Sequence, residues 1–151
     1  MYNRILVPVD GSATSKRGLQ EAIRLAQLTK GRVRLLHVMD VLSLAIAGEG
    51  YSMSSGDLID FAGKRGEEVL AEAKHVVEAA GVPVETSLVD NVSGRVAELV
   101  ADGVAGWKAD VVVLGTHGRR GVGRLMLGSD AEQIVRTSAV PVLLVRAKAG
   151  S

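Results

Sequence analysis

The stretch GTHGRRGVGRLMLGSD, residues 115–130, combines glycines with a helix start, which is the chemistry of an anion-binding loop. Gly115 and Gly118 stand near its beginning, and Gly128 and Ser129 stand where a helical pattern begins. Glycine has no Cβ, so its main chain can approach a ligand closely. The free N–H groups and the positive end of a helix N-terminus attract phosphate oxygens. The stretch therefore predicts a phosphate-binding loop.

Two well-known phosphate-binding motifs do not match this stretch. A P-loop has Gly-Lys followed by Ser or Thr, whereas Gly128 is followed directly by Ser129. The dinucleotide fingerprint Gly-x-Gly-x-x-Gly lies at the first strand-to-helix turn. Here Gly121 and Gly123 come much later in the chain, and Met126 stands in place of the third glycine. An anion site in this loop must therefore depend on another spacing of glycines.

Five apolar segments alternate with helical patterns along the chain. Strands are expected at residues 4–9, 32–38, 82–89, 110–114 and 140–145. Helices are expected from Ser12 or Thr14 to residue 30, from the N-cap Asp57 to residue 80, from Ser93 onward and over residues 129–137, with a long connection at 40–56. Solidly apolar strands that alternate with helices predict an α/β fold: a doubly wound parallel sheet with helices on both faces.

The carboxyl ends of the strands are where such a sheet binds ligands, at the point where the strand order reverses. The segments that follow strands one, two and four are residues 10–12, 37–40 and 115 onward. Asp10 is thus a candidate ligand contact. Asp-Gly is also a common turn pair, so an Asx turn at Asp10 is the alternative.

Side chains of the glycine-rich loop also have two interpretations each. His117 lies between two glycines, which favours a ligand contact over an ordinary surface position. Ser129 can contact phosphate, or it can serve only as the N-cap of a capping box with Glu132. The remaining basic side chains of the loop are more typical of a solvated surface, and these are Arg119, Arg120 and Arg124.

The composition excludes several classes of protein. The 151 residues suit one domain, and 47% of them are hydrophobic. The net charge of +1 gives no basic excess for a nucleic-acid-binding protein. The chain has no cysteine, which excludes disulfides and thiolate chemistry. No apolar run is long enough to cross a membrane, and the N-terminus does not resemble a signal peptide, so we expect a cytoplasmic protein.

Four motifs together resemble the universal stress protein family. They are VPVDGS at residues 7–12, LLHV at 35–38, the spacing Gly-x2-Gly-x9-Gly-Ser from Gly115 to Ser129, and VPVLLV at 140–145. The resemblance covers the whole chain, so it implies one domain of this type over residues 1–151. It also implies a five-stranded sheet in the order 3-2-1-4-5. The glycine spacing is that of the family's ATP-binding branch, which implies ATP, ADP or AMP as the ligand.

The resemblance assigns the adenosine part of the nucleotide to the first two strands. Pro8 and Val9 would line the adenine pocket, and Val38 would contact adenine through its main chain. Asp10 would accept hydrogen bonds from the ribose hydroxyls or help to hold a Mg²⁺ ion.

The phosphates are assigned, by the same resemblance, to the glycine-rich loop. Gly115, His117 and Gly118 would surround the α- and β-phosphates. Gly128 and Ser129 would bind phosphate oxygens, with Ser129 supplying both its N–H and its hydroxyl group.

Asp130 departs from the family pattern, in which we expect a small apolar residue. A carboxylate in the first turn of a helix is favourable to the helix dipole. The same carboxylate repels phosphate groups if it points at them. Asp130 is therefore counted among the candidate site residues, with an expected effect on triphosphate binding.

The resemblance further implies a homodimer joined through the last strand, Val140 to Val145. An apolar strand at the edge of a sheet is prone to pair with another chain, and pairing across a two-fold axis satisfies it. The expected function is a nucleotide-binding regulatory protein with no catalytic residues and no membrane or nucleic-acid partner.

Three other functions are compatible with parts of the sequence. A slow ATPase or a nucleotidyl transferase would use Asp10 and His117 around Mg²⁺. A phospho-accepting receiver domain would use Asp90, but it needs a pair of acidic residues after the first strand, where this chain has Asp10 and Gly11. A dimerisation module without a ligand would not require the glycine pattern.

Overall fold

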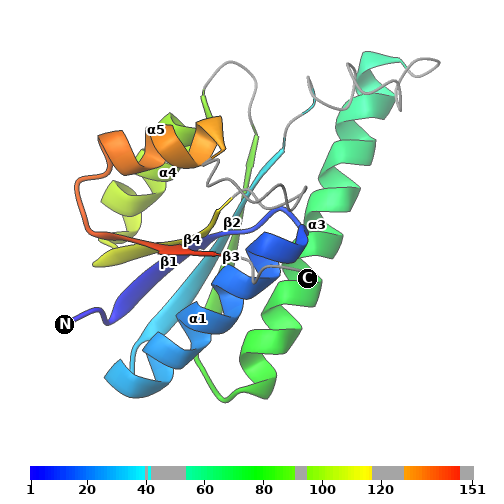
Figure 1. The fold of residues 1–151 in the computed structure, drawn as a ribbon. Coiled ribbons are helices and arrows are strands. Elements are labelled where there is room, and N and C mark those ends of the chain that lie inside the picture. The colour runs from blue at the N-terminus through cyan, green and yellow to red at the C-terminus, as the bar shows by residue number, and fades with distance from the viewer. Residues whose placement is uncertain (40, 42–53, 91–94, 117–127, 147–151) are drawn as a thin grey trace.

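The computed structural model describes residues 1–39, 41, 54–90, 95–116 and 128–146. Its elements alternate between strand and helix throughout (Figure 1). In chain order they are β1 (Arg4–Pro8), α1 (Ala13–Thr29), β2 (Arg32–Met39), α3 (Ser55–Ala79), β3 (Val84–Asp90), α4 (Val96–Trp107), β4 (Val111–Gly115), α5 (Ser129–Thr137) and β5 (Val142–Val145).

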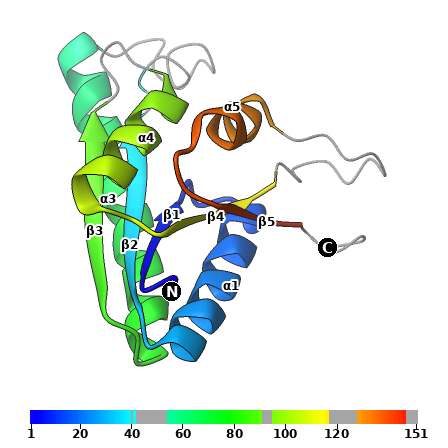
Figure 2. The same ribbon diagram turned by 90° about the vertical axis from the view of Figure 1, so that its left-hand side faces the viewer.

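The strands form one five-stranded sheet in the order β3-β2-β1-β4-β5, and every pair is parallel. Helices α1 and α3 cover one face, and α4 and α5 cover the other (Figures 1 and 2). The order reverses between β1 and β4, so the connections that follow these two strands lead to helices on opposite faces, α1 and α5. The predicted doubly wound α/β fold and its strand order are confirmed.

Burial on both faces explains why the strands are apolar without alternation. In β1, Ile5 and Val7 pack with the core under α1 and α3, whereas Leu6 packs with the core under α4 and α5. In β4, Val113 packs with the core under α1 and α3, and Val112 packs with the core under α4 and α5. All five side chains are at most 1% exposed.

Some element boundaries differ from the prediction. Helix α3 begins at Ser55 because the hydroxyl of Ser54 accepts a hydrogen bond from the N–H of Asp57, so Ser54 and not Asp57 is the N-cap. Helix α4 begins at Val96 after the N-cap Arg95, so the predicted start at Ser93 was too early.

Three strands are shorter than predicted. β3 begins at Val84 because the N–H of Val82 bonds back to Val77 at the end of α3. β5 begins at Val142, because the main chain of Val140 bonds the hydroxyl of Ser138 and the following Pro141 has no N–H group. β1 ends at Pro8 because the chain turns into α1 after Val9.

Trp107, the last residue of α4, packs at the end of the sheet that lies away from the strands' carboxyl ends. This side chain is buried, and two guanidinium groups lie over the ring: Arg4 at 5.4 Å and Arg34 at 5.0 Å from its centroid. Arg34 also hydrogen-bonds Glu85 at 2.9 Å, which lowers the pKa of Glu85 below its ordinary value. This cluster stabilises the end of the sheet that lies away from the strands' carboxyl ends.

Helix α1 lies in main-chain contact with β4, and two glycines permit this. A Cβ on Gly18 would lie 2.9 Å from the main-chain nitrogen of Gly115. A Cβ on Gly115 would overlap the carbonyl oxygen of Thr14 in the first turn of α1. This contact places the start of α1 beside the end of β4. Among the helices in the described ranges, none is long and apolar enough to span a membrane.

We predict that Gly115→Ala destabilises the protein by about 1–3 kcal/mol, because the added methyl group must push α1 away from β4. The matched control is Gly106→Ala in α4, where an added Cβ meets no atom within 4 Å. The control should change the free energy of unfolding by less than about 1 kcal/mol. Urea denaturation measures both, and equal stabilities would contradict the close approach of α1 to β4.

Candidate functional site

A cleft of about 520 Å³ opens at the carboxyl ends of the strands, where the strand order reverses. Its walls come from the ends of β1 and β4, the middle and end of β2, and the first turns of α1, α4 and α5. This volume lies within the range of pockets that hold small organic molecules and cofactors. The position is the one that doubly wound sheets use for ligands.

One wall of the cleft is apolar. It is formed by side chains from five elements that the fold brings together: Pro8, Leu36, Val38, Val96, Leu114 and Ile134. Leu36, Leu114 and Ile134 are buried, and the other three are half-buried. Such a surface suits a flat, weakly polar ring rather than a charged group.

The turn between β1 and α1 forms a polar wall. The N–H of Ser12 donates to Oδ1 of Asp10 at 2.9 Å, so Asp10 makes the Asx turn that its sequence allowed. Gly11 has φ +82°, in the left-handed region that favours glycine. Ser12 is the N-cap of α1, since its hydroxyl accepts from the N–H of Ser15 at 3.2 Å. The turn uses one carboxylate oxygen of Asp10, and this exposed side chain still lines the cleft.

The start of α5 forms the opposite polar wall. Gly128 is the N-cap, and it has no side chain to accept a hydrogen bond. The first helical bond runs from the N–H of Glu132 to the carbonyl of Gly128 at 2.9 Å. The N–H groups of Ser129, Asp130 and Ala131 therefore have no partner within the helix, and these residues line the cleft. A helix N-terminus with unused N–H groups is suited to an anionic ligand group.

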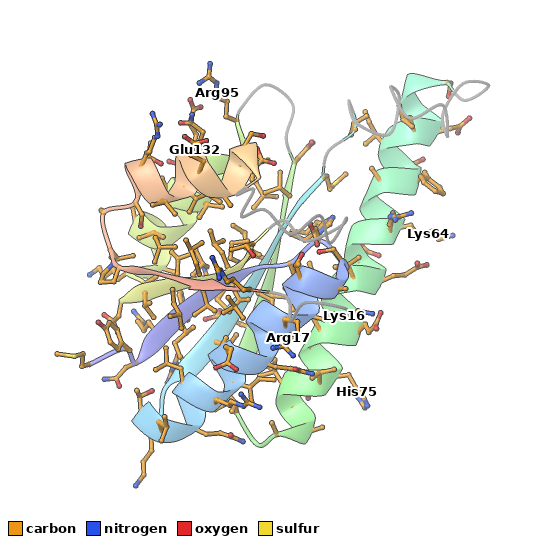
Figure 3. All side chains as sticks on the ribbon, viewed as in Figure 1. Lys16, Arg17, Lys64, His75, Arg95 and Glu132 are labelled. Carbon is orange, nitrogen blue, oxygen red and sulfur yellow. The ribbon has the colours of Figure 1, made fainter. Side chains whose placement is uncertain are left out.

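The capping-box alternative for Ser129 is wrong. A capping box needs its serine at the N-cap, but Ser129 is the first residue inside the helix. Glu132, labelled on α5 in Figure 3, instead accepts a hydrogen bond from Arg136 one turn later, at 2.7 Å. Ser129 is exposed and lines the cleft at the helix start.

The structure brings most of the residues predicted for the site into this one cleft. Those that line it are Pro8, Val9, Asp10, Val38, Gly115, Gly128, Ser129 and Asp130. His117 and Gly118 lie outside the described residues. Gly115 has a packing role in addition, through its contact with α1.

Other residues of the cleft were not predicted as site residues from the sequence. Ser12 and Thr14 were considered only as helix caps, yet their hydroxyl oxygens lie 3.2 Å apart at the cleft and can reach a polar ligand. Their position just after a buried strand was the available signal. Leu36, Val96 and Ile134 carry no such signal, because only the pairing of β2 with β1 and the packing of α4 and α5 bring them to the cleft.

Metal ligands are few in the described part of the molecule. It contains no group of three or more His, Cys, Asp or Glu side chains that could hold a metal ion. Asp10 and Asp130 both line the cleft and supply carboxylate oxygens, the kind of ligand that Mg²⁺ prefers. Mg²⁺ usually binds through one or two carboxylates together with substrate phosphates, so these residues fit a metal that arrives with a nucleotide.

The fold defines a doubly wound α/β protein with a cleft at the switch point of its sheet. Comparison with known proteins gives the family: residues 1–146 match the model of the universal stress protein family. The chain belongs to this family.

Named relatives agree with that assignment. A universal stress protein of Thermus aquaticus is 34% identical over 97% of this chain and 100% of its own. One from Methanocaldococcus jannaschii is 32% identical over 97% of this chain and 83% of its own. The crystal structure of a family member from Burkholderia pseudomallei has 28% identity and a TM-score of 0.76, covering 97% of each chain.

Two more distant family members were solved with adenine nucleotides. One from Archaeoglobus fulgidus, in complex with dAMP, has 22% identity and a TM-score of 0.68 over 95% of this chain and 97% of its own. Another, in complex with cAMP, has 22% identity and a TM-score of 0.67 over 97% of this chain and 98% of its own. At this identity the likeness to our chain concerns the fold.

We predict that Ser129→Ala leaves the stability of the free protein unchanged to within about 0.5 kcal/mol, because no helix cap is lost. The matched control is Ser54→Ala, which removes the N-cap of α3, does not line the cleft and should cost about 1 kcal/mol. Thermal unfolding of both variants measures the difference. A loss for Ser129→Ala as large as that for Ser54→Ala would restore the capping interpretation.

Proposed function

We propose that the chain is a single-domain regulatory protein that binds an adenine nucleotide, ATP, ADP or AMP, in the cleft between β1 and β4. The start of α5 is the observation that carries this proposal. Its N–H groups at Ser129, Asp130 and Ala131 have no partner within the helix, and these residues line a cleft that also has an apolar wall. A nucleotide has the same two-sided chemistry, a flat base and an anionic phosphate chain. The family members solved with dAMP and cAMP support this choice of ligand.

Each part of the nucleotide has a matching surface. Adenine would lie on the apolar wall, against Pro8, Val9 and the main chain of Val38. Asp10 would accept hydrogen bonds from the ribose hydroxyls, since its side chain is exposed at the cleft. The phosphates would bind at Gly128 and Ser129, where the helix presents N–H groups.

The glycine-rich loop would complete the phosphate site. Gly115 starts this loop at the end of β4, and His117 and Gly118 follow it in the sequence. With Gly128 and Ser129 on the opposite side, the loop would enclose the phosphates between two glycine-containing segments.

Asp130 makes the proposed site sensitive to the charge of the ligand. It is the second residue of α5 and lines the cleft beside the N–H groups that would hold phosphate. A carboxylate there opposes each added phosphate charge. A Mg²⁺ ion held with Asp10 would reduce this repulsion, because it adds positive charge between the carboxylates and the phosphates.

We predict saturable binding of an adenine nucleotide in calorimetric titration, and at least about tenfold weaker binding by Gly128→Val. Valine can adopt the backbone conformation of Gly128, φ −59° and ψ 151°, so the variant should fold. Its side chain would cover the N–H groups at the start of α5. Gly106→Val is the control, since an added Cβ there meets nothing within 4 Å. No nucleotide binding by the wild type would refute the proposed function.

A second prediction concerns Asp130→Asn. Without Mg²⁺, removal of this charge should strengthen ATP binding by about 1 kcal/mol, and AMP binding by less. Adding Mg²⁺ should reduce the difference between wild type and variant. Glu132→Gln is the control, because Glu132 lies on the same helix but pairs with Arg136 outside the cleft. Equal effects on ATP and AMP would show that Asp130 does not face the phosphate chain.

We also propose that the chain forms a homodimer through its last strand. In the described part of the chain, β5 is an edge of the sheet and pairs only with β4. Its side chains Leu143 and Leu144 are 42% and 38% exposed, which is high for leucine in a strand. A second copy would pair with this edge and cover both side chains.

Light scattering should therefore give the mass of a dimer for the wild type at micromolar concentration. Leu144→Lys should shift the protein toward monomer, because it places a charge in the interface. Leu28→Lys, at an 84% exposed position of α1, is the control and should leave the mass unchanged. A monomeric wild type would contradict this proposal.

A further inference from the structure

His37 lies behind the cleft and is tied to its polar wall. The residue is in β2, beside β1, and its ring is half-buried on the side of the sheet that α3 covers. Nδ1 lies 2.8 Å from the carbonyl oxygen of Val9. A carbonyl can only accept, so Nδ1 carries the proton and donates to Val9. Val9 immediately precedes Asp10, the residue proposed to bind the ribose.

In this hydrogen bond the imidazole N–H takes the place of a main-chain N–H of the sheet as the donor to the Val9 carbonyl. The N–H of Val9 still pairs with the main chain of β2, at 2.8 Å from the carbonyl of Leu36. The strand then ends, and the chain turns at Asp10 toward α1. Because Val9 is only 6% exposed, its carbonyl needs a protein partner, and the imidazole supplies it. Both main-chain groups of Val9 are thus fixed by β2.

Helix α3 holds the ring from behind. A Cβ on Gly66 would lie 2.6 Å from Cδ1 of Leu88, the neighbour of His37 on β3, and 2.8 Å from Cδ2 and 3.3 Å from Nε2 of His37 itself, so glycine is what permits the helix to pass this close. One turn further along α3, Val69 packs against the turn itself, with its Cγ2 3.3 Å from the position of a Cβ on Gly11. The same face of α3 therefore supports both the ring and the turn.

The rest of the turn is bonded mainly to itself. The N–H of Asp10 donates to Ser15 Oγ at 3.2 Å, and Asp10 in turn accepts from Ser12. These bonds fix the shape of the turn but not its place over the sheet. That place depends on the contact of α1 with β4 and on Val9, whose N–H is held by Leu36 and whose carbonyl is held by His37.

We propose that His37 is a positioning residue for the nucleotide site: its imidazole, clamped between the Val9 carbonyl and Gly66 of α3, holds Asp10 at the position in which it meets the ribose. This inference depends on the proposed function, because it concerns how the same cleft binds its ligand. His37 does not contact the ligand. It acts through the main chain that carries Asp10.

Two substitutions of His37 separate the hydrogen bond from the bulk of the ring. His37→Leu fills a similar space but cannot donate. His37→Asn keeps an N–H donor at the same number of bonds from Cβ as Nδ1, so it can still reach Val9. We expect the dissociation constant for AMP to rise at least about tenfold in His37→Leu and to return to within about threefold of wild type in His37→Asn. His75→Leu is the control, because His75 points away from α3 into solvent (Figure 3).

A substitution in α3 tests the clamp without changing the histidine. Gly66→Ala must displace the ring, whereas Gly63→Ala on the same helix meets only Met39 Cε at an ordinary 3.6 Å. We expect weaker AMP binding from the first and no change from the second. This pair also keeps the inference testable if His37→Leu does not fold.

Calorimetric titration with AMP, together with thermal unfolding of each variant, decides between the outcomes. Weaker binding in folded His37→Leu, restored in His37→Asn, supports the positioning role. Unchanged affinity in His37→Leu and Gly66→Ala, whatever their stability, would overturn it and leave the proposed function intact. A wild type that binds no nucleotide would instead refute the proposed function itself.

Discussion

The contact of α1 with β4 is the constraint on which the site depends. Gly18 and Gly115 bring a helix and a strand into main-chain contact, and side chains at these positions would separate them. Because of this contact, the first turn of α1 lies beside the carboxyl end of β4, although the two are distant in sequence. The cleft then opens between β1 and β4, where the strand order reverses. Gly115 is therefore as much a packing residue as a part of the glycine-rich loop.

The two polar walls of the cleft differ in how their hydrogen bonds are used. The start of α1 is closed by its own side chains, since the Ser12 hydroxyl caps the helix and Asp10 bonds the turn. The start of α5 is left open, because its N-cap Gly128 has no side chain. The unused N–H groups at α5 are where an anion gains most, and the closed turn at α1 offers a fixed carboxylate instead. The proposed function follows this division, with the phosphates at α5 and the sugar at Asp10.

Much of the fold could be predicted from the sequence, because its strands are apolar on both faces and its helices alternate with them. The strand order came from a family resemblance, since no local pattern encodes which strands are neighbours. Predictions failed where one hydrogen bond decided the outcome: Ser54, rather than Asp57, caps α3, and Ser129 lies inside α5 rather than at its cap. Apolar cleft residues such as Val96 were missed because they resemble core residues, and the contact of His37 with Val9 could not be foreseen without the register of β1 and β2.

The central claim is that the start of α5 and the turn after β1 bind the two ends of one nucleotide. The most direct measurement is an NMR titration of ¹⁵N-labelled protein with AMP, in which the chemical shifts of individual main-chain amides are recorded. We predict saturable shifts of the amides of Ser129, Asp130 and Ala131 and, with the same dissociation constant, of Asp10 and Ser12. Amides near Trp107, at the opposite end of the sheet, should not move. Shifts confined to other surfaces, or no saturable shifts at α5, would contradict the account.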